Sequence, residues 1–526
     1  MKFPLRVHSD YSIQKAFGHI NEYVRTAEQN SIPAICLTDF NSISGAIELL
    51  NECKKKPVKP IIGVTTNIII NEISHPITVI SLNKNGWYEL VNLVSFLRSD
   101  INTTPGSITT DYLQYLLNVL FITNTDLDLN KYTNKKIVIN NEPDVYYPTI
   151  SDGLYQTIIE NVGNHTMVKD ILATRKNNSL EQEWSDKSEI YNLVEKYDVS
   201  DKPKIPKLIE NGSIIELPDE YLRKLCRDGW VSSDINRFKK TQHIYDVYTN
   251  RIKEELDTIS GAGLSNYMLL IRDIVNKCHS DKKSVNIRGS AVGSLVAYLS
   301  GISEIDPVIP DSTLPYNKDM SLLFERFINK GRISEGRVAL PDIDIDIVPS
   351  YRDDLKDWIR QKYGQDKVAN IITFLEIKGA SAIKDVFRAL DRPFEAANVI
   401  TKCMVNEAQV QEEIEDAKSE NPDYNIIHYC IDELPQFREF YSDFKYEIDT
   451  AARLCNTVRA EGQHAAGIVI TSDPLTDFLP VKRENGANIV TLRMEDIEYC
   501  GGVKFDLLSV RTLEILDNIK TSIGMK

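Results

Sequence analysis

Residues 341–348 most constrain the fold of this chain, because acidic and apolar residues alternate there one by one. The run reads Pro341-Asp-Ile-Asp-Ile-Asp-Ile-Val348, within a stretch from Val338 to Ser350. A period of two is typical of a β-strand, so we expect Asp342, Asp344 and Asp346 on one face and the isoleucines on the other. The sequence therefore predicts a strand with one buried face and one carboxylate face.

Carboxylates two residues apart on a strand lie about 6–7 Å from each other, from a rise of roughly 3.3 Å per residue, and repel one another. Divalent cations that prefer oxygen ligands, above all Mg²⁺, relieve that repulsion. The alternative is an edge strand that shows its acids to water, which also protects a sheet from aggregation.

The composition is that of a soluble multidomain protein. With 526 residues the chain is too long for one core, so we expect about three domains. The eight cysteines form no CxxC pair, which argues against disulfides and a structural zinc site. No apolar run reaches membrane-spanning length and the N-terminus lacks a signal-peptide core, so we expect a cytoplasmic protein without a membrane partner. The net charge of −15 disfavours a nucleic-acid partner only mildly, because a cleft can have a basic lining of its own.

The first part of the chain alternates between strand and helix patterns. A strand-like run at 4–10 is followed by a helix pattern at 20–29, an apolar strand at 32–39, a helix at 43–53 and a strand at 59–64. This alternation predicts parallel βα units in a barrel. Residues 101–215 are expected to complete the barrel.

A helical tract begins at Pro218, and we expect a domain boundary near Leu217. Further along, the small-residue turn Arg288-Gly-Ser-Ala-Val-Gly-Ser294 precedes an apolar helix at 295–300. Small residues before a helix let backbone N–H groups approach an anion, which predicts a triphosphate cradle. Simple helix capping is the alternative.

The last part of the chain adds one more acid. Residues 376–461 have a mostly helical pattern, and residues 462–470 form an apolar strand pattern that contains His464, either a substrate contact or a structural residue. Residues 501–508 predict another apolar strand whose one acid is Asp506. A buried Asp needs a partner, which a metal shared with the 342–346 strand would supply.

Several motifs in this order resemble one known family. They are Arg288-Gly-Ser, Phe324-Glu-Arg-Phe, Pro341-Asp-Ile-Asp-Ile-Asp, Ile371-Ile-Thr-Phe, His464-Ala-Ala-Gly-Ile-Val-Ile and Val503-Lys-Phe-Asp-Leu-Leu. Together they resemble the alpha subunit of bacterial DNA polymerase III, the C-family replicative polymerase, over nearly the whole chain.

The resemblance implies a multidomain α/β fold. It consists of an N-terminal βα barrel of the polymerase and histidinol phosphatase type at 1–215, and a palm of the polymerase-beta-like nucleotidyltransferase fold, a mixed sheet with helices, at 216–375 and 462–526. A helical thumb at 376–461 interrupts the palm.

The resemblance also implies two-metal transfer of a dNTP to a primer 3′-OH on primer-template DNA. Asp342, Asp344 and Asp506 would hold two Mg²⁺ ions, with Mn²⁺ as the other option, and Asp346 would support them. The residues implied to bind the nucleotide are Arg288, Gly289, Ser290, Gly293, Ser294, Arg326 and Lys504. For Arg326 and Lys504, ordinary ion pairs with nearby acids are the alternative.

The barrel keeps only part of the family's metal-binding set. His8 and Asp39 are present, but Arg6, Phe40 and Thr65 replace two histidines and an acid. Because Arg6 has no acceptor and stays protonated, we expect no phosphoesterase here and structural roles for His8 and Asp39. A different hypothesis is a non-catalytic replisome scaffold whose barrel docks a proofreading exonuclease.

The sequence departs from the family pattern elsewhere too. Ile287 replaces a glycine, residues 308–320 look inserted, and Lys378 stands near the expected Ala-Ala-Lys motif. The chain stops at Lys526, before the fingers and C-terminal regions of the family. We therefore expect a second polypeptide that carries the fingers, with a proofreading exonuclease and a sliding clamp as further partners, in a bacterial or phage-infected cell.

Overall fold

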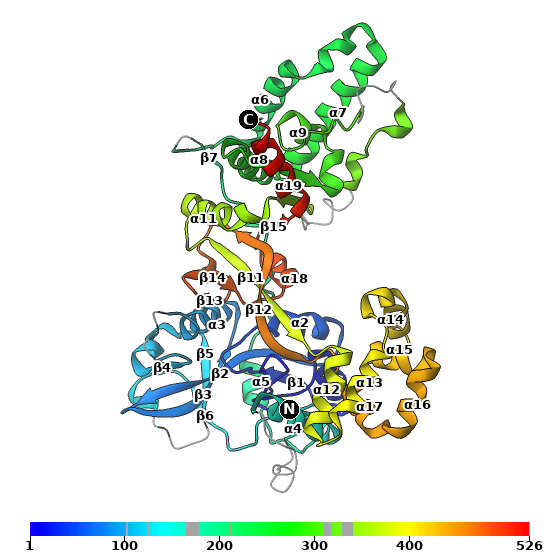
Figure 1. The fold of residues 1–526 in the computed structure, drawn as a ribbon. Helices are drawn as coiled ribbons and strands as arrows, with labels where there is room; N and C mark the ends of the chain where they lie inside the picture. Colours follow the sequence, from blue (N-terminus) through cyan, green and yellow to red (C-terminus); the bar gives the residue numbers. More distant parts are fainter. Residues whose placement is uncertain are drawn as a thin grey trace. The chain divides into compact units, whose positions relative to one another are not determined.

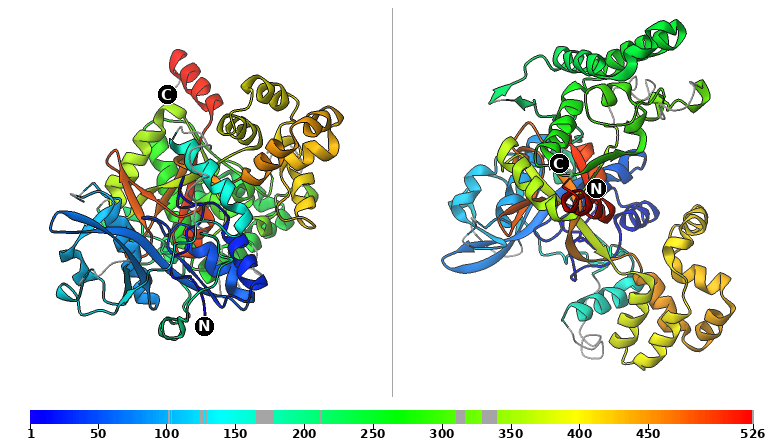
Figure 2. Two further views of the ribbon diagram at one scale, coloured as in Figure 1. Left: turned by 90° about the horizontal axis from the view of Figure 1, so that it is seen from below. Right: turned by 45° about the horizontal axis from the view of Figure 1, so that its top comes forward.

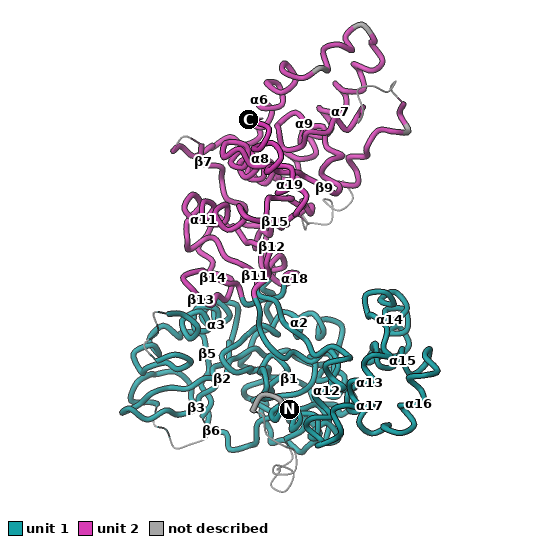
Figure 3. The backbone as a smooth tube through the Cα atoms, in the orientation of Figure 1, with its two compact units in different colours: residues 1–199, 372–462, 491–493 teal, residues 200–371, 463–490, 494–526 magenta. Residues whose placement is uncertain are grey.

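A computed structural model describes residues 1–524, except 101, 103, 124–126, 128, 165–177, 211, 310–316 and 329–339. The start of the predicted acidic strand, Val338 and Ala339, lies outside the described residues, as does most of the predicted insertion at 308–320. Contacts divide the chain into two compact units (Figure 3). Unit 1 comprises residues 1–199, 372–462 and 491–493, and unit 2 comprises 200–371, 463–490 and 494–526.

Unit 1 contains a six-stranded sheet in the order β1-β2-β3-β5-β6, with β4 paired to β2. Its strands are β1 (Ala34–Leu37), β2 (Lys59–Ile70), β3 (Ile73–Ser81), β4 (Ser107–Thr109), β5 (Val119–Thr123) and β6 (Ile137–Ile139). The predicted strands at 32–39 and 59–64 correspond to β1 and β2, which pair in parallel as expected.

The prediction of parallel pairing fails at the next connection. Strands β2 and β3 are antiparallel, and only Asn71 and Glu72 join them, with φ angles of 50° and 66°. A two-residue turn with two positive φ angles forms a tight hairpin, which leaves no room for a crossover helix. The sheet is therefore mixed, and the closed barrel stays a prediction.

Helices form the rest of unit 1. Those before residue 200 are α1 (Ile20–Gln29), α2 (Ala46–Glu52), α3 (Lys84–Leu97), α4 (Gly153–Asn164) and α5 (Ser188–Leu193). The predicted helical region at 376–461 contains α12 (Gly379–Ala389), α13 (Phe394–Lys402), α14 (Gln411–Lys418), α15 (Ile426–Glu433), α16 (Pro435–Asp443) and α17 (Lys445–Leu454). These six helices form one group in Figure 2 and pack around buried side chains such as Phe387, Phe437 and Ile448. The helical prediction is confirmed, whereas the role of thumb stays a prediction.

Unit 2 is built on a seven-stranded sheet in the order β13-β14-β11-β12-β15-β10-β9. Strands β11 to β15 of this sheet are labelled in Figure 1. The strands are β9 (Val285–Arg288), β10 (Asp344–Ile347), β11 (Val368–Glu376), β12 (Val458–Ile470), β13 (Val481–Glu484), β14 (Ala487–Val490) and β15 (Lys504–Ser509). The chain leaves unit 2 within β11 and returns to it within β12. The strands predicted at 462–470 and 501–508 are thus confirmed as parts of β12 and β15.

The described residues of unit 2 form seven helices. They are α6 (Pro218–Ser232), α7 (Gln242–Gly261), α8 (Ser265–Ser280), α9 (Leu295–Leu299), α11 (Arg352–Tyr363), α18 (Met494–Tyr499) and α19 (Arg511–Ser522). One hydrophobic core contains side chains from the helices α6, α7, α8, α9 and α11. The strands β9, β10, β12 and β15 also contribute side chains to this core. Across the described parts of the whole chain, no helix combines the length and apolar character needed to span a membrane.

The acidic strand has its predicted place in this core but is shorter than expected. Strand β10 covers only Asp344–Ile347, so Asp342 lies before the strand. The alternation of burial holds for the isoleucines: Ile343 is 4% exposed, and Ile345 and Ile347 are fully buried. Strand β10 lies between β15 and β9 and is not an edge strand, which contradicts the alternative of a solvent-facing edge.

Close packing of α6 on α9 generates a first prediction. A Cβ atom on Gly229 would lie 1.8 Å from the carbonyl oxygen of Leu299, too close for any side chain. We expect Gly229→Ala to lower the stability of unit 2 by about 3 kcal/mol, because the two helices must separate. The midpoint of urea unfolding of the full chain measures this effect.

Gly261→Ala is the matched control, because this glycine is the last residue of α7 and its added Cβ would meet no atom within 4 Å. Alanine favours a helix over glycine by about 1 kcal/mol, so this variant should be as stable as the parent protein or slightly more. Equal midpoints for the two variants would contradict the packing argument.

Candidate active site on strands β10 and β15

The parallel pairing of β10 with β15 brings two distant acids together. Asp344 is directly opposite Asp506 in the register, although 162 positions in the numbering separate them (506 − 344). Neighbouring strands lie about 4.8 Å apart, and residues in register project to the same face of the sheet. The expected association of Asp506 with the acidic strand is therefore present in the backbone.

Lys504 links the third acid to this pair. Its Nζ lies 3.3 Å from Oδ2 of Asp506 and 3.6 Å from Oδ1 of Asp342. Burial lowers the pKa of Lys504, but the charges of Asp506 and Asp342 outweigh burial and hold the pKa above its usual value. The ammonium group therefore stays charged and bridges the two carboxylates, which is the ion pairing considered as the alternative for this residue.

Arg288, on β9, compensates the negative charges of Asp344 and Asp346. Its Nε lies 3.6 Å from Oδ2 of Asp344 and 3.3 Å from Oδ1 of Asp346. Asp346 is buried, and Nδ2 of Asn286 lies 3.5 Å from its Oδ2, at the limit for a hydrogen bond. Asp346 thus lies deeper than Asp344, and its supporting role stays a prediction.

The donor set fits a divalent cation in its chemistry. Oδ1 of Asp506 is buried and has no hydrogen-bond partner, and carboxylate oxygens are the ligands that Mg²⁺ prefers. However, within the described ranges no three or more His, Cys, Asp or Glu side chains are gathered closely enough to hold a metal ion. In this structure the charges of the acids are compensated by side chains: Lys504 pairs with Asp342 and Asp506, and Arg288 pairs with Asp344 and Asp346.

Glu498 is a further carboxylate near the charges of Lys504, Asp342 and Asp506, and the sequence patterns did not reveal it. Burial raises the pKa of Glu498 above its usual value, Lys504 opposes that shift, and the charges of Asp342 and Asp506 add to it. Glu498 lies on α18, which contacts β15. The only sequence signal was its place six residues before Lys504 in an acidic stretch.

The turn at 288–294 forms a 3-10 helix, η8 (Gly289–Gly293). Gly289 has a φ of 78°, which favours glycine, and it is exposed. Ser290 is partly buried. The segment η10 (Phe324–Arg326) contacts η8, so the exposed Arg326 lies on an element adjacent to this turn. Arg288, Gly289 and Ser290 thus lie at or near the surface, beside the acids.

Two predicted nucleotide-binding residues have clear structural roles. A Cβ on Gly293 would lie 2.8 Å from the carbonyl oxygen of Leu323, so this glycine permits close packing. Ser294 is fully buried; its hydroxyl donates to Oε2 of Glu255 at 2.9 Å and accepts the N–H of Ala297 as the cap of α9. Ser294 matches the capping alternative, Gly293 serves packing, and a direct nucleotide contact stays a prediction for both.

The barrel site that the sequence predicts to be degraded lies in unit 1, and it contains the side-chain cation of Arg6. Nε of Arg6 lies 2.6 Å from Oδ1 of Asp144, and Nε2 of His8 lies 3.2 Å from Oδ2 of the same carboxylate. Phe40 stacks on His8 with 4.4 Å between ring centroids. The sequence reasoning missed Asp144, which follows a proline in a stretch without a regular pattern.

Asp39 and Thr65 are also used inside unit 1. Asp39 accepts hydrogen bonds from the N–H of Ser9 at 2.7 Å and from the hydroxyls of Ser9 and Ser12 at 2.8 and 2.6 Å. The hydroxyls of Thr65 and Thr78 lie 3.0 Å apart. These contacts fit the structural roles expected for His8 and Asp39.

The Arg6–Asp144 pair generates a pH prediction. Burial raises the pKa of Asp144. The hydrogen bond from His8 and the charges of His8 and Arg6 lower this pKa by more than burial raises it, so it lies below its usual 3.8. A lowered carboxyl pKa contributes stability above the pKa of the unfolded chain and loses it as pH falls through the folded value. We expect Asp144→Asn to cost about 3 kcal/mol at pH 7, because the buried charge of Arg6 is left without a carboxylate partner.

The difference between the two proteins should begin to shrink once the pH falls below about 4, where the carboxyl of the unfolded chain becomes protonated, and should be lost as the pH falls through the lower pKa of the folded protein. Urea unfolding at pH 7, 5 and 3 measures it. Asp423→Asn is the control, because Asp423 pairs with Arg25 at 3.2 Å on the surface of the same unit and should change stability by less than about 1 kcal/mol. A pH-independent cost for Asp144→Asn would contradict this assignment.

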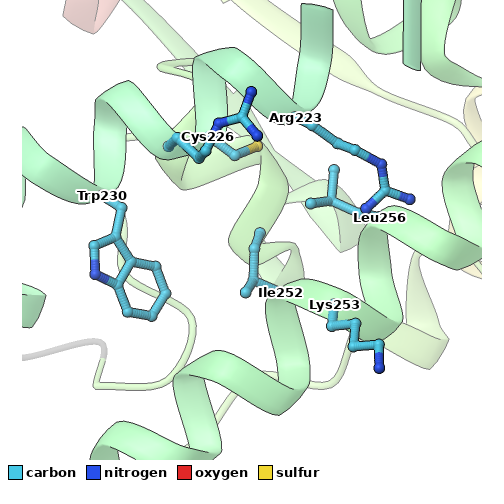
Figure 4. A pocket seen from close by; sticks show the side chains of 7 residues that line it. Arg223, Cys226, Trp230, Ile252, Lys253 and Leu256 are labelled. Carbon is cyan, nitrogen blue, oxygen red and sulfur yellow. The ribbon is translucent and has the colours of Figure 1, made fainter. Parts of the chain in front are cut away.

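Unit 2 also has an open pocket of about 270 Å³ between α6 and α7 (Figure 4). Its lining consists of Arg223, Cys226, Arg227, Trp230, Ile252, Lys253 and Leu256. These seven residues include no carboxylate and no histidine, so the pocket cannot contribute metal ligands or a general base of those types. The β10–β15 site is the candidate for chemistry.

Comparison with known proteins identifies the class of this chain. Residues 220–509, more than half of the chain, match the family described as bacterial DNA polymerase III alpha NTPase domain, and residues 4–175 match the PHP domain. The chain therefore belongs to the bacterial DNA polymerase III alpha family, which confirms the resemblance seen in the motifs.

Individual relatives carry the same name. The chain is 29% identical to DNA polymerase III subunit alpha of Borreliella burgdorferi, over 99% of this chain and 49% of the relative. It is 28% identical to the Ureaplasma parvum protein of that name, over 98% and 51%, and 26% identical to the Escherichia coli protein, over 98% and 48%. The chain spans about half the length of these curated relatives.

Proposed function

We propose that this chain supplies the palm of a replicative DNA-directed DNA polymerase, which transfers a nucleotide from a dNTP to the 3′-OH of a primer. The observation that carries the proposal is the register of Asp344 with Asp506, with Asp342 joined to Asp506 through Lys504. Membership of the polymerase III alpha family adds independent support.

Asp342, Asp344 and Asp506 would hold two divalent cations, Mg²⁺ or Mn²⁺. When bound, the two ions supply positive charge for the attacking and leaving oxygens of the transfer. Oδ1 of Asp506, which is buried and has no hydrogen-bond partner, has free acceptor capacity for such an ion. Lys504 and Arg288 neutralise the acids in the absence of cations and would turn toward the triphosphate once the cations replace them.

The transfer joins the primer 3′ oxygen to the α-phosphorus of the dNTP and breaks the bond between the α-phosphorus and the bridging oxygen. Pyrophosphate leaves, and the hydroxyl proton passes to solvent. Arg288, Arg326 and Lys504 would bind the phosphate oxygens by charge-assisted hydrogen bonds, and Gly289 and Ser290 would allow the triphosphate to approach the backbone. Gly293 and Ser294 would hold this turn in place, Gly293 by its close packing and Ser294 as the cap of α9.

The proposal extends to the organisation of the enzyme. We assign residues 216–375 and 462–526 to the palm, 376–461 to the thumb and 1–215 to the barrel. Because Arg6 already neutralises Asp144, the barrel has a structural role in this proposal. Primer-template DNA, a fingers-bearing polypeptide, a sliding clamp and a proofreading exonuclease are the partners of the complete polymerase.

A primer-extension assay tests the function. The full chain is incubated with Mg²⁺, a dNTP and primer-template DNA, alone and with a polypeptide that corresponds to the second half of the relatives. Because two of the three cation ligands are lost, we expect Asp344→Asn with Asp506→Asn to reduce the extension rate at least about 10³-fold.

Asp257→Asn is the control, because Asp257 pairs with Arg223 on the surface of unit 2 at 2.8 Å and has no place in the proposed site. Its extension rate should equal that of the parent chain. Full activity of the double variant at Asp344 and Asp506 would refute the assignment.

A further inference from the structure

Tyr267 joins the two segments that carry Asp342 and Asp506, although neither the sequence motifs nor the proposed chemistry includes it. This residue lies on α8 and is 1% exposed. Its hydroxyl donates a hydrogen bond of 2.7 Å to the carbonyl oxygen of Pro341, the residue before Asp342. Its ring stacks on Phe505, the residue before Asp506, with 5.3 Å between centroids and 21° between planes.

The position of Asp342 depends on such a contact. The paired registers of β10 with β15 and with β9 begin at Asp344, so the backbone at Asp342 lies outside the ladders. The side chain of Asp342 is 82% exposed, and its ion pair with Lys504 spans 3.6 Å. An ion pair at this distance, with one partner exposed to water, fixes the exposed side chain only weakly.

The backbone before Asp342 offers few other anchors. Pro341 has no N–H group, so the carbonyl oxygen is the one main-chain hydrogen-bonding group that this residue offers. The hydroxyl of Tyr267 binds that oxygen from inside the core, where a hydrogen bond is both well ordered and costly to lose. Burial, together with the charges of Asp342, Glu498 and Asp506, raises the pKa of Tyr267, so the phenol keeps the proton that it donates.

We propose that Tyr267 is a positioning residue that holds the Pro341–Asp342 backbone against β15, so that Asp342 can share a divalent cation with Asp506. This inference rests on the proposed function, because it concerns the same cation-binding acids. The hydroxyl fixes Asp342 and the ring fixes the start of β15, so that one side chain sets their spacing.

Tyr267→Phe tests the inference, because it removes the hydroxyl and keeps the stacked ring. Binding of Mn²⁺ to the full chain is measured by electron paramagnetic resonance, without DNA or nucleotide. We expect the affinity for Mn²⁺ to fall about fivefold, which is the effect that the loss of one hydrogen bond usually has on an equilibrium constant. In primer extension, the Mg²⁺ concentration for half-maximal rate should rise by a similar factor, and the rate at saturating Mg²⁺ should recover.

Tyr363→Phe is the matched control. Tyr363 is also a buried tyrosine of unit 2, and its hydroxyl donates to Oδ2 of Asp273 at 2.6 Å. We expect this variant to lose stability in thermal unfolding without any change in Mn²⁺ affinity. A merely structural role for Tyr267 would make the two variants behave alike.

The outcomes separate the inference from the proposed function. If the parent chain binds Mn²⁺ and the double variant at Asp344 and Asp506 does not, the cation site stands; an unchanged affinity in Tyr267→Phe then overturns the role of Tyr267. If the parent chain and the double variant bind Mn²⁺ equally, the proposed cation site fails, and the inference fails with it.

Discussion

The arrangement of unit 2 depends on the pairing of β10 with β15, which places like charges side by side. Asp344 and Asp506 face each other across a parallel ladder, and in a folded protein such a pair is unfavourable without a compensating cation. Lys504 and Arg288 supply that cation from β15 and β9. The helices α6 to α9 and α11 bury the opposite face of this part of the sheet and fix the register.

Unit 1 also contains a carboxylate that needs a compensating charge, Asp144. There Arg6 and His8 lie against Asp144 in a buried setting, and Phe40 covers His8. A buried ion pair is costly to break, so Arg6 is a permanent counter-ion. In unit 2, by contrast, Asp342 and Arg288 are exposed and their ion pairs are longer. Of these two sites, the β10–β15 site is therefore the one where the ion pairs cost less to break.

Sequence patterns predicted the local structure well and the pairing of strands less well. The alternation at 341–348 identified a strand with buried isoleucines, and the helical patterns identified α1, α6, α7 and the group α12 to α17. The hairpin at Asn71 and Glu72 was missed: Asn71 favours a turn, but Glu72 stands where such turns usually have glycine, and the geometry depends on the pairing of β2 with β3. Asp144 and Glu255 were missed because their partners are distant in sequence.

The sequence by itself determined the chemistry available to this protein. It contains a strand in which aspartates alternate with isoleucines, the further acid Asp506, a glycine-serine turn and the motifs of the polymerase III alpha family. Those features are local, so residue types and spacing reveal them. Only the tertiary structure decided that Asp506 lies opposite Asp344, that Lys504 bridges to Asp342, that Ser294 is used as a buried cap and that Tyr267 ties Pro341 to β15. Strand register and core packing bring together residues far apart in the chain, and no local pattern encodes which of them will meet.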